Sequence, residues 1–278
     1  MESPFASPDE FVVVDYKAAS PKIKTPVRIV YFSDLHNAEY GEGNRALLEE
    51  IRNDRPDLIL VGGDVLVGRS DAGLEEALTV MRALPDIAPT YFSNGNHETR
   101  TRYYTGEYEG KYRHFVTELR KAGVHVLNNR SEVVEMGGVR MRIFGLELPL
   151  PYYKKFHLPR LRMRKMWWFC GSPEEEAFNI LLAHNPQFAR TYMNWGADLC
   201  LCGHFHGGLV RGPLTGRAFL NPYGFVFPRY GYGHFMADGR HLVVSSGLGD
   251  HNIPIRVFNP HEMVVIDLVP EEEDAAER

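Results

Sequence analysis

Residues 28–64 read RIVYFSDLHNAEYGEGNRALLEEIRNDRPDLILVGGD, and this stretch decides the fold. Residues 28–34 and 58–64 each contain four consecutive apolar residues and end in an aspartate, which is typical of a buried strand with a polar end. Between them, residues 44–57 carry apolar side chains at helical spacing with a proline near the end. The order strand, helix, strand predicts an α/β fold.

Three later segments repeat the pattern of an apolar run that stops at polar residues. They are residues 90–97 (TYFSNGNH), 179–186 (NILLAHNP) and 199–207 (LCLCGHFHG). Residues 74–89 again have helical spacing. From Val124 onwards the runs alternate, and Gly137-Gly138 separates two of them, which predicts a hairpin. With further strand candidates at residues 241–248 and 262–269, two sheets are favoured over one parallel sheet.

Composition indicates a globular chain with one large core. The chain has 278 residues, 44% hydrophobic and 24% charged. We expect a single domain over residues 1–270, with a basic-aromatic insertion or lid at about 150–170, and an acidic tail at 271–278. The formal charge of -5 argues against a general nucleic-acid coat protein, because non-specific binding relies on clustered Lys and Arg.

The sequence contains no signal-peptide pattern and no run of 18 apolar residues. Three cysteines do not indicate a disulfide framework. These features predict a cytoplasmic protein. Residues 152–169 combine six Lys or Arg residues with several aromatic ones, so an ordinary packed segment, a lid over the substrate and a peripheral contact with the inner membrane surface all stay open.

Eight polar side chains follow the predicted strands, where ligands collect in open α/β sheets. They are Asp34, His36, Asp64, Asn96, His97, His184, His204 and His206. Carboxylate, imidazole and amide groups suit Mn, Fe or Zn better than the harder Mg or Ca. We expect Cys200 and Cys202 to be buried strand thiols rather than soft ligands.

Eight such residues exceed the needs of one ion. Two ions about 3.5–4 Å apart need a bridging carboxylate, and Asp64 is the natural candidate. Glycines should relieve crowding where the chain turns at the metals. These glycines are Gly62, Gly63, Gly95 and Gly203.

The ordered blocks DLH (34–36), GGD (62–64), GNHE (95–98), an isolated His184, and GHFHGG (203–208) resemble the signature of the calcineurin-like metallophosphoesterase superfamily. The resemblance implies a two-sheet β-sandwich flanked by helices, the four-layer αββα fold. One ion would be bound by Asp34, His36, Asp64 and His206, and the other by Asp64, Asn96, His184 and His204. Asp64 and His97 would be catalytic, with His97 contacting the substrate phosphate.

The C-terminal third is similar to the YkuE-like bacterial subgroup of this superfamily. The resemblance rests on GHFHGG, NPYGF, RYGYG and the segment SSGLGDHNIPIRVFNPHEMVVIDL at residues 245–268. Subgroup members include phosphodiesterases and hydrolases that act on UDP-diacylglucosamine. The resemblance places His251 near the metals, and either His251 or Arg256 could bind a phosphate. Val67 replaces the last aspartate of the usual GDxxD pattern.

The sequence therefore predicts a dinuclear metal-dependent phosphoesterase that cleaves a phosphodiester, pyrophosphate or phosphomonoester bond with a metal-bridging hydroxide. A phosphorylated small-molecule or lipid-linked substrate is expected, and the oligomeric state is not readable. A nuclease with the same metals is one alternative, supported by the basic residues around Arg160. A metal-binding interaction scaffold without catalysis is the other, disfavoured by the complete ligand set. Residues 100–114 are either a surface loop or one wall of the pocket.

Overall fold

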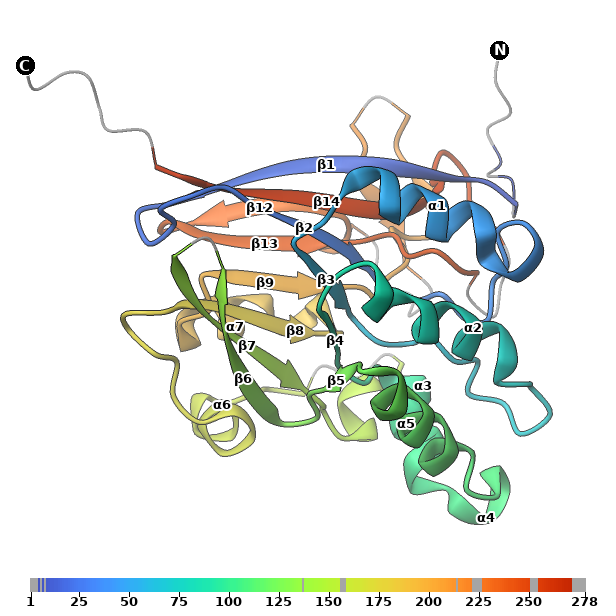
Figure 1. Cartoon of the computed structure of the whole chain (residues 1–278). Helices are drawn as coiled ribbons and strands as arrows, with labels where there is room; N and C mark the ends of the chain where they lie inside the picture. Colours follow the sequence, from blue (N-terminus) through green and yellow to red (C-terminus); the bar gives the residue numbers. More distant parts are fainter. Residues whose placement is uncertain are drawn as a thin grey trace, which may run out of the picture.

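The computed structural model describes residues 5, 7, 9–136, 138–155, 159–213, 215–221, 227–250 and 255–271. Its core consists of two six-stranded sheets that pack face to face (Figure 1). A short two-stranded ribbon, β10 (Val210–Arg211) and β11 (Ala218–Leu220), lies outside these sheets. None of the helices in the described part of the chain has the length and apolar character that crossing a bilayer requires.

The first sheet joins the N-terminal half of the chain to its last strand. Its strands, in spatial order, are β1 (Phe11–Ser20), β14 (His261–Pro270), β2 (Val27–Phe32), β3 (Leu58–Val61), β4 (Thr90–Phe92) and β5 (His125–Val126). Strands β2 to β5 are parallel, whereas β14 runs antiparallel to β2 and parallel to β1.

The second sheet is built from the C-terminal half. Its strands, in spatial order, are β12 (Gly233–Ala237), β13 (Arg240–Val244), β9 (Leu199–Cys202), β8 (Phe178–Ala183), β7 (Val139–Leu146) and β6 (Arg130–Met136). The four central strands are parallel, and the two edge strands pair antiparallel with their neighbours. The parallel strands of both sheets therefore supply the polar carboxyl ends that the sequence predicted.

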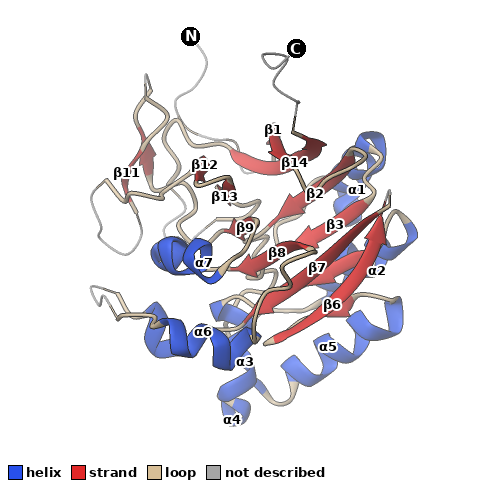
Figure 2. Ribbon diagram, turned by 90° about the vertical axis from the view of Figure 1, so that its left-hand side faces the viewer, coloured by secondary structure: helices blue, strands red, loops and turns tan. Residues whose placement is uncertain are grey.

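Helices cover the outer face of each sheet, so the layers are helix, sheet, sheet, helix. The first sheet is covered by α1 (Arg45–Asp54), α2 (Glu75–Ala83) and α5 (Lys111–Ala122). The second is covered by α6 (Met163–Cys170) and α7 (Ala189–Trp195). Figure 2 shows α6 and α7 on one side of the strands and α1 and α2 on the other. The predicted αββα sandwich is confirmed.

The remaining helices are short. They are α3 (Asn96–Tyr103), α4 (Thr105–Tyr108) and the 3₁₀ turns η1 (Glu42–Asn44), η2 (Leu84–Asp86), η3 (Leu150–Tyr153) and η4 (Pro186–Phe188). The segment at 100–114 is thus mainly helical, because it spans the end of α3, all of α4 and the start of α5, rather than forming a surface loop.

Side chains along the central strands point alternately to the helix layer and to the interface between the sheets. Both environments are buried, so both faces of these strands are apolar. In β3, Ile59 and Val61 pack under the helices while Leu58 and Leu60 enter the interface between the sheets. In β9, Leu199 and Leu201 enter that same interface. Cys200 and Cys202 face the α6 and α7 layer and are fully buried, which confirms them as packed thiols away from the polar site. Burial on both faces is typical of central strands in covered sheets.

The strands and helices predicted from the sequence are present, but four strands within the described ranges were not predicted. The hairpin forms between β6 and β7, and α1 and α2 lie within the two predicted helical segments. The strands that the sequence did not predict are β1 and β12, each at the edge of a sheet with a partly exposed face, and the short ribbon strands β10 and β11. In the predicted insertion, α6 contributes Met166 and Phe169 to the core, and the lid function remains a prediction. The predicted tail from residue 272 lies outside the described residues.

Candidate metal centre

The seven predicted metal ligands come together at one end of the two sheets. Asp34 and His36 follow β2, Asp64 follows β3, and Asn96 begins α3 after β4. From the second sheet, His184 follows β8, and His204 and His206 follow β9. Because the carboxyl ends of these parallel strands meet, residues up to 170 positions apart in the chain become neighbours.

Three overlapping groups of these side chains could hold a metal, with ligand atoms within 4.8 Å of one another in each group. The groups are Asp34, His36 and His206; His36, Asp64 and His97; and Asp64, His184 and His204. The first and third groups each contain three of the four residues in one of the two ligand sets expected from the resemblance. The second group places His97 beside Asp64, which the third group also contains.

Asp64 lies between the two ligand sets. Its Oδ2 is 3.0 Å from His184 Nε2 and 4.0 Å from His36 Nε2, which belong to different sets. Its other oxygen, Oδ1, accepts the backbone N–H of His97 at 2.7 Å. One oxygen is therefore held by the main chain, and the other faces both sets, as a bridging ligand requires.

Asp34 is oriented in a similar way. Its Oδ2 accepts the hydroxyl of Ser33 at 2.6 Å and the backbone N–H of His204 at 3.0 Å. Its Oδ1 lies 3.3 Å from His206 Nε2 and 3.6 Å from His184 Nε2. These contacts leave Oδ1 directed at the histidines of the site.

Backbone carbonyls orient the histidine rings. The Nδ1 atoms of His184, His206 and His36 lie 2.8 Å from the carbonyl oxygen of Gly62, 3.2 Å from that of Gly249 and 3.3 Å from that of Leu66, respectively. A ring that donates from Nδ1 to a carbonyl keeps its Nε2 lone pair for a metal. In all three rings Nε2 faces the carboxylates.

Two buried polar atoms at the site show that the residues fit a metal. Asn96 Oδ1 has no hydrogen-bond partner among the described residues, and His184 Nε2 makes no hydrogen bond of good geometry there, although it lies 3.0 Å from Asp64 Oδ2. A buried polar atom without a partner costs about 1–3 kcal/mol, so such atoms are retained where a ligand satisfies them. Both atoms belong to the ligand set shared with His204.

The electrostatics of the site favour a bound cation. Burial by itself would lower the pKa of His184, but the charges of Asp64 and Asp34 outweigh it and raise the pKa to about 10. Conversely, burial would raise the pKa of Asp34, but the nearby His206 and His184 hold it below its ordinary value. The field that favours a proton on His184 equally favours a metal ion at that position.

The main chain at the site is strained. Five of the seven candidate ligands adopt positive φ angles of 48° to 66°: Asp34, His36, Asp64, His204 and His206. Such conformations are uncommon for residues other than glycine and gather at functional sites. The predicted need for glycines is confirmed, since a Cβ on Gly95 would lie 2.2 Å from Asp64 Oδ1 and one on Gly203 would lie 2.1 Å from Asp34 Oδ2.

His97 is held in one tautomer beside the metal ligands. The backbone N–H of Gly68 donates to its Nδ1 at 2.7 Å, so the ring proton of the neutral form resides on Nε2. That Nε2 lies 3.9 Å from Asp64 Oδ2. Burial lowers the pKa of His97 below its ordinary value. The geometry leaves an N–H donor directed into the site.

Glu98 is a site residue that the sequence analysis quoted in the GNHE block without giving it a role. Its fully buried carboxylate accepts the backbone N–H groups of Asp64, Leu66 and Gly95 at 2.8, 3.0 and 2.9 Å. Burial, together with the charge of Asp64, raises its pKa to about 7. The available sequence signal was the spacing of Glu98 three residues after Gly95, the N-cap of α3, because a glutamate at that position binds the N-cap backbone N–H.

The two predicted substrate residues differ in position. His251 lies outside the described residues. Arg256 is buried behind His206, where its Nη2 donates to the backbone oxygens of Ser246 at 2.8 Å and Gly249 at 2.6 Å and lies 3.2 Å from His206 Nδ1. These contacts support the loop against the site, and a phosphate contact of Arg256 stays a prediction.

A cavity of about 490 Å³ opens beside the metal centre, and Asn96 and His97 form part of its wall. Arg100, Tyr104 and Tyr108 line another part, so residues 100–114 do contribute a pocket wall. The third part comes from η3 and the residues that follow it.

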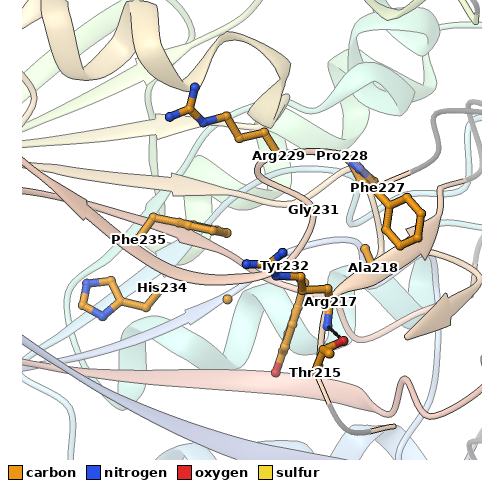
Figure 3. A pocket seen from close by; sticks show the side chains of 12 residues that line it. Thr215, Arg217, Ala218, Phe227, Pro228, Arg229, Gly231, Tyr232, His234 and Phe235 are labelled. Atoms are coloured by element: carbon orange, nitrogen blue, oxygen red, sulfur yellow. Dashed lines mark hydrogen bonds between the residues drawn. The ribbon is translucent and has the colours of Figure 1, made fainter. Parts of the chain in front are cut away.

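A second cavity of similar volume lies between β11 and β12 (Figure 3). Its walls include Arg217, Phe227, Tyr232 and Phe235, and they contain none of the candidate metal ligands. Of these two cavities, the one beside His97 is the one that borders the candidate metal centre.

The fold and the site define a class. The chain belongs to the calcineurin-like phosphoesterase family, whose model matches residues 27–208 and so includes every candidate metal ligand. The protein is a metal-dependent phosphoric ester hydrolase.

Particular relatives are similar along most of the chain. It is 26% identical to Phosphodiesterase YaeI of Escherichia coli (strain K12), over 88% of this chain and 84% of the relative. It is 27% identical to the uncharacterized metallophosphoesterase YkuE of Bacillus subtilis (strain 168), over 87% and 78%. A solved dimetal phosphatase from Danio rerio has a TM-score of 0.41 at 12% identity and covers 80% of this chain and 88% of that one.

Proposed function

We propose that this protein hydrolyses a phosphodiester or pyrophosphate bond in a phosphorylated small molecule or lipid-linked substrate. The observation that supports this most directly is the position of Asp64 Oδ2 between His184 and His36. A carboxylate in that position suits a pair of metal ions, and such pairs serve in-line displacement at phosphorus.

We propose two metal ions, with Mn, Fe or Zn as the candidates. Asp34, His36, Asp64 and His206 would hold one ion, and Asp64, Asn96, His184 and His204 the other. When bound, the ions supply positive charge for the phosphoryl oxygens and lower the pKa of a water molecule so that it can attack. The strained turns keep the ligand atoms in place before the substrate arrives.

His97 would act on the substrate through its Nε2–H. Because Gly68 fixes the tautomer, this group can donate a hydrogen bond to a phosphoryl oxygen or a proton to the leaving oxygen. Asp64 Oδ1, by accepting the backbone N–H of His97, keeps the ring beside the metal ligands.

The test is hydrolysis of bis-p-nitrophenyl phosphate and p-nitrophenyl phosphate by metal-stripped protein that has been refilled with Mn. We expect turnover that depends on Mn and is lost in Asp64→Asn, with the diester preferred. Glu49→Asn, an exposed substitution on α1, is the matched control and should keep activity. Equal turnover in Asp64→Asn and the control would contradict the proposed site.

We also propose that α6 makes a peripheral contact with an anionic membrane surface. Trp167 and Trp168 are 55% and 73% exposed, unlike most large apolar side chains of this protein. Lys165 lies 5.1 Å from the ring of Trp168, and Arg162 and Arg164 are exposed beside it. Cations next to exposed tryptophans suit the headgroup region of a bilayer.

Liposome sedimentation tests the membrane contact. We expect binding to vesicles that contain phosphatidylglycerol, weaker binding to neutral vesicles, and loss of binding in Trp167→Ser/Trp168→Ser. Met236→Ser, at another residue that is 70% exposed, is the control. No binding to either vesicle, or equal binding by the double variant, would exclude a contact through α6.

A further inference from the structure

The cavity beside His97 is larger than one phosphate group needs. At about 490 Å³ it falls in the range of pockets that enclose a whole small-molecule ligand. The metal centre touches it only through Asn96 and His97. The rest of the cavity would therefore surround the part of a substrate beyond the scissile phosphate.

The charge of this cavity is its most informative feature. Its lining contains four basic side chains, Arg69, Arg100, Lys154 and Lys155, against the single acidic side chain of Glu107. The whole chain carries a net charge of -5, so the excess of positive charge in this cavity is opposite in sign to the net charge of the protein. Clustered cations in a cleft attract anionic ligands.

The four cations are not equivalent. Arg69 is already engaged, with its Nε and Nη2 bonded to Asp71 at 3.0 and 2.9 Å. Arg100 and Lys154 are exposed and form no ion pair with a carboxylate of the described residues, and Arg100 lies beside the Tyr108 hydroxyl. Arg100 lies in α3, about one helical turn after the candidate ligand Asn96, whereas Lys154 directly follows η3. The two cations thus reach the cavity from different elements.

The walls that carry these cations are joined to the metal centre. Tyr153, next to Lys154, packs its ring against His204 with centroids 5.0 Å apart. On the other wall, Tyr108 donates its hydroxyl to the Gly68 carbonyl at 2.8 Å, and the Gly68 N–H binds His97. Both walls are therefore in contact with residues of the candidate metal centre or with the residue that holds His97.

We propose that the substrate carries a second phosphate group besides the scissile one, and that Arg100 and Lys154 bind it. This inference rests on the proposed function and narrows its substrate class. A guanidinium offers paired donors to phosphate oxygens and an ammonium a compact charge, so together they suit a dianionic group. The second phosphate could be joined directly, as in a pyrophosphate, or sit on another hydroxyl of the same molecule.

Three chromogenic substrates test the proposal with Mn-loaded full-length protein. The reference is the p-nitrophenyl ester of thymidine 5′-phosphate. The second adds a phosphate at the 3′-hydroxyl, and the third is the p-nitrophenyl ester of thymidine 5′-diphosphate, so each differs from the reference by one phosphate. Because cleavage between the two phosphates of the third ester releases p-nitrophenyl phosphate rather than p-nitrophenol, the products of all three reactions are quantified by chromatography. We expect KM to be about tenfold lower or more for the second or the third ester, in the range of charge-assisted hydrogen bonds.

Variants connect that preference to the two cations. In Arg100→Gln/Lys154→Gln we expect the ratio of KM values between reference and phosphorylated ester to fall towards one. Arg45→Gln/Arg52→Gln removes the same charge from exposed positions on α1 and should keep the wild-type ratio. Metal content and Tm, measured on all variants, show whether each is folded and loaded.

The outcomes separate the two proposals. A preference for the 3′-phosphate ester or for the diphosphate ester that disappears only in the cavity variant supports the inference and tells which linkage is used. Hydrolysis of all three esters with equal KM, or an unchanged preference in the cavity variant, overturns the inference while the phosphoesterase proposal stands. Failure of the Mn-loaded protein to hydrolyse any of the esters counts against both.

Discussion

The buried carboxylate of Glu98 accepts the backbone N–H of Asp64 at 2.8 Å, although 34 positions separate the two residues in the chain. The same carboxylate binds the N–H groups of Leu66 and Gly95, so it fixes the turn on both sides of Asp64. Asp64 adopts a positive φ of 51° in this turn. Glu98 therefore positions the proposed bridging ligand without facing the site itself.

Replacing Glu98 by glutamine tests this relationship. The amide keeps one acceptor oxygen but places an NH₂ group against backbone N–H donors, so the turn should loosen. We expect metal affinity to fall by about 10–100-fold, as for other partners that orient metal ligands. Competition with a fluorescent chelator measures this affinity, and Glu49→Gln on the exposed face of α1 is the control. An affinity equal to that of the control would remove the positioning role.

Substitution of His97 separates chemistry from metal binding. We expect His97→Ala to lower kcat by roughly 10²–10⁴-fold, the range of a general acid or base, while both metals stay bound. The substitution removes the Nε2–H donor, which the contact between the Gly68 N–H and His97 Nδ1 fixes in place, and it leaves every candidate metal ligand unchanged. Kinetics together with metal analysis check this, with the exposed His114→Ala as control. Unchanged turnover at saturating metal would exclude the role.

The glycine at position 95 should be indispensable for the site. A Cβ there would lie 2.2 Å from Asp64 Oδ1 and 2.6 Å from Asp64 N, so Gly95→Ala must displace the proposed bridge. We expect loss of bound metal and of activity together. Gly106→Ala in α4 is a matched control, because a Cβ at Gly106 meets nothing within 4 Å. Full metal content in Gly95→Ala would show that the turn can adjust.

Removal of metal should lower thermal stability. Bound ions would satisfy His184 Nε2 and Asn96 Oδ1 and offset the charges of the two aspartates. At a metal concentration 100 times Kd, binding stabilises the folded state by about 2.7 kcal/mol, which corresponds to a Tm increase of roughly 5 °C or more for a chain of this size. Scanning calorimetry with Mn and with EDTA measures it. Asp64→Asn should lose most of the difference, and an equal difference in that variant would mean that Mn binds elsewhere.

Much of the fold was readable because the central strands are buried on both faces. Runs such as residues 58–61 and 199–202 are apolar at every position, and the polar residues that end them mark the carboxyl edge of a sheet. The edge strand β1 could not be read in this way. Its pairing with β14 joins opposite ends of the chain, and one of its faces is partly exposed.

The sequence by itself predicted an α/β fold with two sheets and eight polar site residues at strand ends, because side-chain type and spacing along each strand are local properties. The family resemblance implied the αββα layers and the division of the ligands between two ions. Tertiary structure alone decided which atoms share the site: that Asp64 Oδ2 faces both His184 and His36, that Glu98 holds the turn, and that Arg256 is buried behind His206. Each of these depends on contacts between residues far apart in the chain. Such contacts are set by how the sheets pack, which no local pattern records.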